Sequence, residues 1–368
     1  MEYALSELFT LQMGKTPSRD NSSYWKKSEN NWISIADLTN SGKYISNTKE
    51  TLSDSAVAES GIKKIPANTV IMSFKLSLGK VAITEKEMYS NEAIMAFIDK
   101  GVEKISPEYL YYLLRAKDWS KGTNKAVMGA TLNKATLSTI KIQLHEYDNQ
   151  LEIVNMLNRV SSSIDFRKQQ LTKLDELIKA RFVEMFGNAE TTSQAQTKRL
   201  EECCISISGG NTPSMQHPEY YGGKIPFIKS GDVKSDHISV SSLTLTQIAL
   251  NETTVKMLPK GTLIVVIRSA ALLKEFRIGI LDVDAVINQD LKALQTSDDV
   301  LPVYLMWAIK MKSQVLLSRV QTMLTSHIRM EDLLDLKVQI PHLSLQNQFA
   351  NFVAEINKSK VEVQKALD

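Results

Sequence analysis

The sequence has little of what catalytic, secreted or membrane proteins need. Its 368 residues include only 2 cysteines and 5 histidines. The cysteines, Cys203 and Cys204, are adjacent, so they neither bridge easily to one another nor make a metal site alone. No apolar run approaches the roughly 18 residues of a membrane span, and the first residues lack the basic start and apolar core of a signal peptide. We therefore expect a reduced, cytoplasmic protein without a metal site.

The motifs of common catalytic sites are also missing. No glycine-rich loop has the spacing of a phosphate or dinucleotide site, and there is no Gly-x-Ser-x-Gly elbow. The histidines form no His-x-x-x-His pair. Such a chain is more typical of a recognition module than of an enzyme. We therefore expect no catalytic residues and no cofactor on this chain, with a stand-alone enzyme as the less favoured alternative.

The sequence does contain one long helical pattern, from Asp148 to Gly187. Proline is absent from this stretch, and its polar faces leave a single apolar stripe. The apolar positions recur every seven residues, at Leu157, Ile164, Leu171, Ile178 and Met185. A seam kept over about five heptads predicts a helix, roughly 55–60 Å long, that packs along another helix. The alternative is a helix buried in an ordinary core.

The chain is also an internal repeat. The turn Gly14-Lys-Thr16-Pro17 returns as Gly210-Asn-Thr212-Pro213, 196 residues later. Asn91-Glu-Ala likewise corresponds to Asn288-Gln-Asp, and Gln150 falls on Gln346, after which a second heptad pattern follows. The predicted order is therefore globular unit, long helix, globular unit, shorter helix.

Each globular unit has a mixed pattern. Thr69–Phe74 and Gly261–Ile267 read as strands, and Pro107–Ala116 and Pro302–Met311 read as helices that a proline opens. We therefore predict an α/β (α+β) fold with a two-fold repeat, whose two long helices form an antiparallel coiled coil. Pairing of the seam with another chain is the alternative. The predicted boundaries are 1–146 and 188–343 for the units, and 147–187 and 344–368 for the central and distal helices.

Basic loops follow the central strand of both units, and both carry a Thr-Pro turn. Arg and Lys can contact phosphates or guanine edges, while Ser, Thr and Asn can position on the backbone or read bases. The alternatives are that the loops are basic only for solubility and that the Thr-Pro sequences only fix tight turns. The basic loops and the turns occupy matching positions in both copies, which favours a DNA-binding role. The net charge of +3 permits DNA binding without requiring it. The candidates are Lys15, Thr16, Ser18, Arg19, Lys75, Ser77 and Lys80 in the first unit, and Asn211, Thr212, Ser214, Lys229, Arg268, Ser269, Lys274 and Arg277 in the second.

Two stretches carry a resemblance to a known family. They are Lys173-Leu-Asp-Glu-Leu-Ile-Lys-Ala-Arg-Phe-Val-Glu-Met-Phe-Gly187 and Ile287-Asn-Gln-Asp-Leu-Lys-Ala-Leu294. With the paired Thr-Pro turns and the order of elements, they make the chain resemble the specificity (S) subunit of type I restriction–modification systems. The resemblance implies two target recognition domains held apart by the helices, each reading half of a bipartite double-stranded DNA target.

The resemblance also implies partners. The helices would set the gap between the half-sites and dock two modification (methyltransferase) subunits, which carry S-adenosylmethionine. Restriction subunits would add ATP- and Mg-dependent translocation and cleavage. A coiled-coil scaffold whose globular units bind protein is the competing class.

One departure from the family pattern concerns the distal helix. It stops where the central helix has reached only Thr172, and it has no counterpart of Leu-Asp-Glu-Leu-Ile-Lys-Ala-Arg-Phe. We therefore expect the last turns of the central helix to be free for a modification subunit. The expected contact residues are Leu174, Ile178, Arg181, Phe182 and Phe186.

Overall fold

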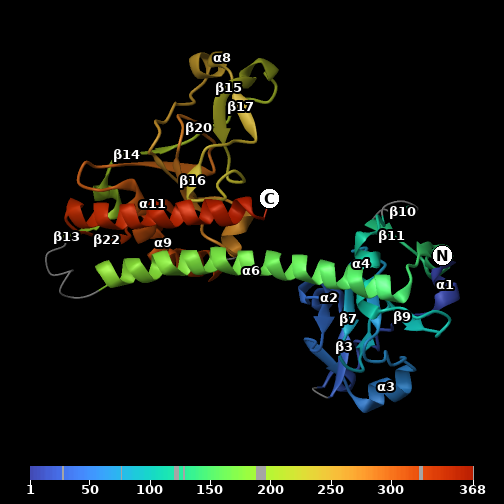
Figure 1. The fold of residues 1–368 in the computed structure, drawn as a ribbon. Coiled ribbons are helices and arrows are strands. Elements are labelled where there is room, and N and C mark those ends of the chain that lie inside the picture. The colour runs from blue at the N-terminus through green and yellow to red at the C-terminus, as the bar shows by residue number, and fades with distance from the viewer. Residues whose placement is uncertain are drawn as a thin grey trace. The chain divides into compact units, whose positions relative to one another are not determined.

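The computed structural model describes residues 1–26, 29–75, 77–119, 124–126, 129–187, 196–322 and 326–367. It divides into two compact units, Met1–Ser163 and Ile164–Asp368, and the helix α6 (Tyr147–Phe186) runs through the division. Both units contain a five-stranded and a three-stranded sheet whose strands follow one another in the same order along the chain, as the repeat predicts (Figure 1). None of the helices in the described residues is long and apolar enough to cross a bilayer.

Unit 1 is built on a five-stranded sheet with the order β2-β9-β6-β7-β4. Its strands are Phe9–Met13, Ile94–Asp99, Val70–Ser73, Val81–Thr84 and Tyr44–Ile45. A three-stranded sheet has the order β5-β3-β8, with strands Glu50–Leu52, Asn30–Ile33 and Tyr89–Ser90. Two antiparallel pairs complete the strands: β1 (Glu2–Ala4) with β12 (Lys141–Gln143), and β10 (Asn124–Ala126) with β11 (Gly129–Thr131).

The central strand β6 separates two cores. Every residue of this strand is buried. Because side chains alternate along a strand, Val70 and Met72 enter one apolar cluster while Ile71 enters the other. The helix α4 (Pro107–Ala116) packs in the first cluster. Ser106 caps its N-terminus, and the proline at its first position favours a helix start. The remaining helices are α1 (Leu5–Leu8), α2 (Ile35–Asn40), α3 (Asp54–Ser60) and α5 (Lys134–Thr139).

Unit 2 repeats this design. Its five-stranded sheet has the order β14-β21-β18-β19-β16, and its three-stranded sheet the order β17-β15-β20. These strands are Cys204–Gly209, Leu291–Thr296, Leu263–Val266, Ile278–Leu281 and His237–Ile238, then Leu243–Leu245, Tyr221–Ile228 and Val286–Ile287. β13 (Gln196–Arg199) pairs with β22 (Lys337–Ile340). The helices are α8 (Gln247–Glu252), α9 (Pro302–Thr322), α10 (Met330–Leu334) and α11 (Leu343–Lys365).

The two long helices form the predicted antiparallel pair. In unit 2, the early residue Phe349 of α11 lies against Phe182 near the end of α6, with 5.3 Å between ring centroids. The later residue Lys360 instead bonds Asp175, with 2.8 Å between Nζ and Oδ1. Contacts that move backwards along α6 as α11 advances define antiparallel packing (Figure 1).

The expectation that the last turns of α6 lack an internal partner is wrong. Ile178 and Phe186 are buried in the main core of unit 2, and Phe182 packs against that core. The helices are antiparallel, so the start of α11 meets the end of α6. Leu174 remains partly exposed, whereas Arg181 lies 5.7 Å from the Phe352 ring and bonds Glu184.

The first turns of α6 belong to unit 1. Val154 is buried in the core of that unit, and Lys43 reaches Asn158 of α6 with 2.8 Å between Nζ and Oδ1. These described contacts fasten the start of α6 to the unit that precedes it in the chain.

Candidate nucleic-acid interface

The Thr-Pro turn of each unit packs tightly against a second loop. In unit 1 the backbone N–H of Lys15 donates to the Ser90 carbonyl at 2.8 Å. A Cβ placed on Gly14 would lie 2.2 Å from the carbonyl oxygen of Asn91, and one on Gly210 would lie 2.0 Å from that of Ile287. Since no side chain fits at such distances, glycine is required at both positions by the close approach of two backbones.

The threonine of each turn fastens the same second loop. The hydroxyl of Thr16 donates to the Glu92 carboxylate, and the hydroxyl of Thr212 donates to the Gln289 amide oxygen. Both acceptor side chains are exposed. Glu92 and Gln289 are absent from the predicted candidates, although the repeat places them at matching positions. The only signal in the sequence is that Asn91-Glu corresponds to Asn288-Gln.

The basic loop after the central strand reaches the same place. In unit 1 the backbone N–H of Phe74 donates to the Ala93 carbonyl at 3.0 Å. In unit 2 the N–H groups of Ile267 and Arg268 donate to the Asp290 carbonyl at 2.9 and 3.2 Å. Three segments far apart in the sequence thus meet in each unit. We call the segment Asn91–Ala93 of unit 1 and the matching Asn288–Asp290 of unit 2 the Asn loop. In each unit, the Thr-Pro turn, the Asn loop and the basic loop together are called the recognition edge.

Other candidates lie beside the recognition edge. The backbone N–H of Asn288 donates to Ile228, which places the following Lys229 next to the Asn loop. Lys80 and Arg277 hold matching positions, because their carbonyls accept from Ser73 and Val266 at the two strand ends. Asn211 donates to Thr254 at 3.0 Å between Nδ2 and Oγ1. Ser18, Ser77, Ser214 and Ser269 lie within the same turns and loops.

Several predicted cations are already engaged within the molecule. Arg19 donates two hydrogen bonds to Glu50, at 2.6 and 3.0 Å, and its guanidinium lies 3.6 Å from the Trp25 ring centroid. The hydrogen bond between them raises the pKa of Arg19 and lowers that of Glu50. Arg277 similarly bonds Glu275. These contacts hold the two guanidinium groups in place. Arg19 and Arg277 could therefore contact DNA only in this orientation, unless the DNA displaces the two carboxylates.

Further cations differ in how they are presented. Lys15 donates to the Ser60 carbonyl at 2.5 Å, and Lys80 donates to the Thr39 hydroxyl at 2.6 Å. Lys75 is half-buried, with its ammonium 5.3 Å from the Phe74 ring centroid. Arg268 has a side chain that is 63% exposed and lies 3.9 Å from the Asp290 carboxylate, and Lys274 is exposed in the same loop. The Arg268–Lys274 loop is therefore an accessible basic part of the recognition edge of unit 2.

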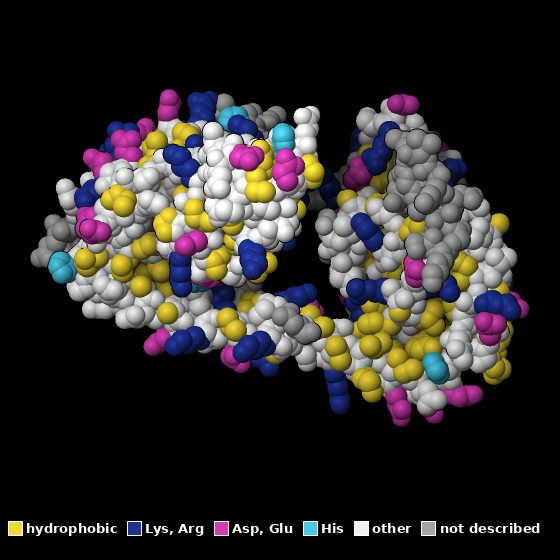
Figure 2. Space-filling view, turned by 90° about the horizontal axis from the view of Figure 1, so that it is seen from above, with side chains coloured by type: hydrophobic (Ala, Val, Ile, Leu, Met, Phe, Trp, Pro, Cys, Tyr) yellow, Lys and Arg dark blue, Asp and Glu magenta, His cyan; other side chains and the backbone are white. Residues whose placement is uncertain are grey.

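The surface as a whole is of mixed charge. In Figure 2, Lys and Arg side chains on the visible face of each unit are interspersed with Asp and Glu. This agrees with the small net charge and makes specific loops, rather than one broad basic field, the basis of any DNA contact. Among the described residues, no three His, Cys, Asp or Glu side chains gather as a metal ion would require.

Two copies of one α/β unit, each with the same recognition edge and each running into a long helix, define a duplicated recognition protein. The family model described as "Type I restriction modification DNA specificity domain" matches residues 1–176 and 192–367. The chain therefore belongs to this family, with one domain in each half.

Curated proteins with similar sequences are specificity subunits of type I restriction enzymes. The chain is 28% identical over 288 residues to the specificity subunit of the type I restriction enzyme MjaIX from Methanocaldococcus jannaschii, covering 73% of this chain and 65% of that protein. It is 29% identical over 189 residues to the HindI specificity subunit from Haemophilus influenzae, covering 49% and 40%. The matches thus span less than two thirds of these relatives.

Two solved structures share the fold. An S subunit of a type I restriction–modification system from M. genitalium matches with a TM-score of 0.56 and 13% identity, covering 100% of this chain and 91% of that one. A second, from a study of complex assembly and conformational transition of the type I system, matches with 0.53 and 16%, covering 100% and 95%.

Proposed function

We propose that this chain is the DNA sequence-specificity subunit of a type I restriction–modification complex and is not itself catalytic. Each unit reads one half of a bipartite double-stranded target through its recognition edge. The observation that carries the proposal is the duplication of that edge: in both units a threonine turn, an Asn loop and a basic loop are bonded together. The family match to both halves and the names of the relatives support it.

The two half-sites differ in sequence because the two edges differ in chemistry. Unit 1 presents Lys75 and Glu92, whereas unit 2 presents Arg268 and Gln289. A carboxylate only accepts hydrogen bonds and suits a cytosine amino group, while an amide can both donate to and accept from adenine. Arg offers a bidentate fork for guanine that Lys lacks.

DNA binding by the chain is tested by electrophoretic shift with mixed-sequence duplexes, with and without modification subunits. Binding should weaken steadily as salt rises, because lysines and arginines release counterions from phosphates. Binding that is absent under both conditions would favour a scaffold whose units bind protein.

One modification subunit docks on a groove of the helix pair in unit 2. The groove has a volume of about 780 Å³ and is lined by Phe166, Leu174 and Leu177 of α6 and Val363 of α11. Phe166 is 58% exposed and Leu177 46%. Lys168 and Lys173 also line it, so an apolar helix with acidic flanks fits best. Of the five residues predicted for this role, Leu174 alone lines the groove.

Substituting Phe166 and Leu177 together by glutamate should weaken assembly with a modification subunit by at least about tenfold, because central apolar anchors dominate such interfaces. Titration followed by light scattering or calorimetry measures the affinity. The matched control is Met156→Glu, an exposed apolar residue of α6 outside the groove. Equal affinity of the double variant and the control would exclude this docking site.

The remaining parts of the complex are assigned to other chains. We propose that two modification subunits bring S-adenosylmethionine and that restriction subunits bring ATP- and Mg-dependent translocation and cleavage. The complex would act in the cytoplasm, where the DNA is. Methyl transfer by the isolated chain would contradict this division.

A further inference from the structure

One buried glutamine occupies the same place in both units. Gln150 is the fourth residue of α6, and Gln346 is the fourth residue of α11. Their exposed fractions are 1% and 0%. Glutamine is seldom buried so completely, so its recurrence at the start of both long helices needs a reason other than filling space.

Each glutamine joins three separate segments with its side-chain amide. The Oε1 of Gln150 accepts from the Ser106 N–H at 3.0 Å, and its Nε2 donates to the Lys104 and His145 carbonyls at 3.2 and 2.9 Å. The amide thus ties the first turn of α6 to the loop before α4 and to the chain that leaves β12.

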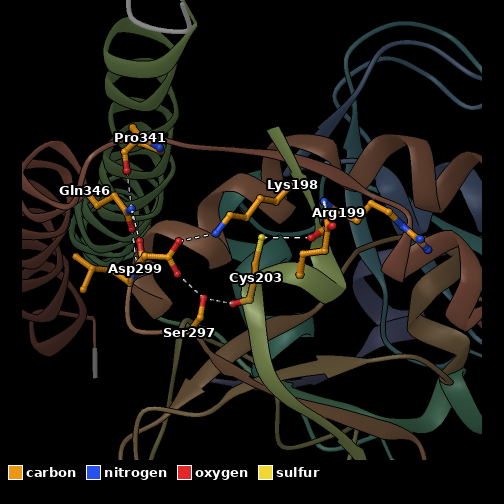
Figure 3. Close-up of polar contacts among 9 residues, drawn as sticks. Lys198, Arg199, Cys203, Ser297, Asp299, Pro341 and Gln346 are labelled. Atoms are coloured by element: carbon orange, nitrogen blue, oxygen red, sulfur yellow. Dashed lines mark hydrogen bonds and ion pairs between the residues drawn. The ribbon is translucent and has the colours of Figure 1, made fainter. Parts of the chain in front are cut away.

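Unit 2 repeats the arrangement bond for bond. The Oε1 of Gln346 accepts from the Leu301 N–H at 2.8 Å. Its Nε2 donates to the Asp299 and Pro341 carbonyls at 2.9 and 2.8 Å (Figure 3). We call the glutamine and its three backbone partners in each unit the joint. Because all the partners are backbone atoms, neighbouring side chains can differ between the units while the joint is unchanged.

The neighbouring side chains do differ. In unit 1 the Lys104 ammonium lies 3.9 Å from the ring centroid of Tyr147, the first residue of α6. In unit 2 the Asp299 carboxylate accepts from Lys198 of β13 at 2.6 Å, as Figure 3 shows. The glutamine and its backbone partners are therefore the same in both units, although the side chains around them differ.

A second repeated bond braces the joint. The hydroxyl of Tyr109 in α4 donates to the Gln143 carbonyl of β12, and that of Tyr304 in α9 donates to the Gln339 carbonyl of β22. An apolar side chain in place of either glutamine could fill the same space, but it could not fix the rotation of the helix. The three hydrogen bonds of each glutamine point in different directions, so they set both the position and the angle at which the long helix leaves its unit.

We propose that Gln150 and Gln346 are positioning residues that fix the direction of each long helix against its recognition unit, and so set the gap between half-sites that the complex accepts. This rests on the proposed function. The glutamines touch neither DNA nor cofactor; they act through the helices. Loosening either joint lets the recognition edges reach half-sites at the wrong spacing.

The test uses the full chain assembled with its modification subunit and S-adenosylmethionine. Initial methylation rates are compared on duplexes that carry the preferred half-sites at the preferred gap and at one base pair more or less. The wild-type complex should discriminate by about 100-fold, the order of penalty for a misplacement of atomic size. Gln150→Met and Gln346→Met should each lower this ratio about tenfold, with the half-site sequences unchanged.

Gln346→Asn keeps the amide on a side chain that is one methylene shorter, so it can keep only some of the three bonds, and its ratio should lie between those of wild type and Gln346→Met. It also provides a variant that keeps the polar group if the methionine variant does not fold. The matched controls, Asn149→Ala and Asn347→Ala, change exposed residues next to the glutamines and should keep the wild-type ratio.

Two failures are distinguishable. A ratio that stays at the wild-type value while melting temperature falls would overturn the positioning role, because a loss of active complex lowers all rates equally. A wild-type complex that methylates no bipartite duplex would instead sink the proposed function, and this inference with it.

Discussion

Replacing Phe349 by alanine should destabilise unit 2 by about 3–5 kcal/mol, the range for truncating a buried aromatic side chain. Phe349 is fully buried, and the ring centroids of Phe182, Phe186 and Trp307 lie 5.3, 5.6 and 6.5 Å from its own. This cluster joins the start of α11 to the end of α6. Its loss therefore opens the helix pair as well as leaving a cavity.

Chemical denaturation followed by circular dichroism measures the change in the free energy of unfolding. Phe166→Ala is the control, because that ring is 58% exposed and its loss should cost less than about 0.5 kcal/mol. A similar small loss for Phe349→Ala would mean that the antiparallel packing of α11 on α6 is wrong.

Removing the cation of Arg268 should weaken binding to one half-site by about 5- to 150-fold, which corresponds to the 1–3 kcal/mol of a good bidentate base contact. Arg268 is the most exposed arginine of its recognition edge, and its backbone is fixed by Asp290. Competition binding with duplexes mutated in one half or the other measures the loss.

The reciprocal change provides the sharpest control. Lys75→Ala belongs to the other recognition edge and should affect the other half-site. Lys365→Ala, exposed on α11 and paired with Glu362, should affect neither. If Arg268→Ala weakens binding equally for all sequences, the contact is to phosphate. If it affects both half-sites of the bipartite target alike and Lys75→Ala does the same, the assignment of one unit to one half is wrong.

Sequence patterns predict the long helices and the repeat because both signals extend over many residues. A seven-residue apolar period that recurs through α6 has few other solutions, and matching turns such as Gly14 and Gly210 make the units alike. The antiparallel pair and the two mixed α/β units are confirmed.

Helix contacts could not be predicted from the repeat alone. Aligning the two copies start to start makes the end of α6 look unpartnered, whereas antiparallel packing brings that end to the start of α11. Apolar periodicity shows that a helix has a seam but not which part of the partner fills it. The repeat alone therefore assigns Ile178 and Phe186 to another protein, although they belong to the core of this one.

The length of α9 was underestimated for a local reason. The apolar pattern after Pro302 stops at Met311 because a polar run, Lys312-Ser-Gln314, follows. The helix nevertheless continues to Thr322, since Leu316, Leu317 and Val320 are buried on the next turns. Tertiary packing overrode the break in the pattern.

The recognition edge was partly accessible from sequence. Its turns and loops stand out because they recur, but bonds between distant residues do not. Glu92 and Gln289 were missed because they become part of the edge only through Thr16 and Thr212. The engagement of Arg19 by Glu50, 31 residues away in the chain, was equally hidden.

The role of the two units is tested most directly by a map of methylated adenines in DNA from cells that carry this chain with its modification subunit. If each unit reads half of the target, the map should show one bipartite motif with two different short half-sites and a fixed gap, and Arg268→Ala should alter a single half of it. A continuous motif, or a methylation pattern that is the same without this chain, would contradict the claim that its two units each read half of the target.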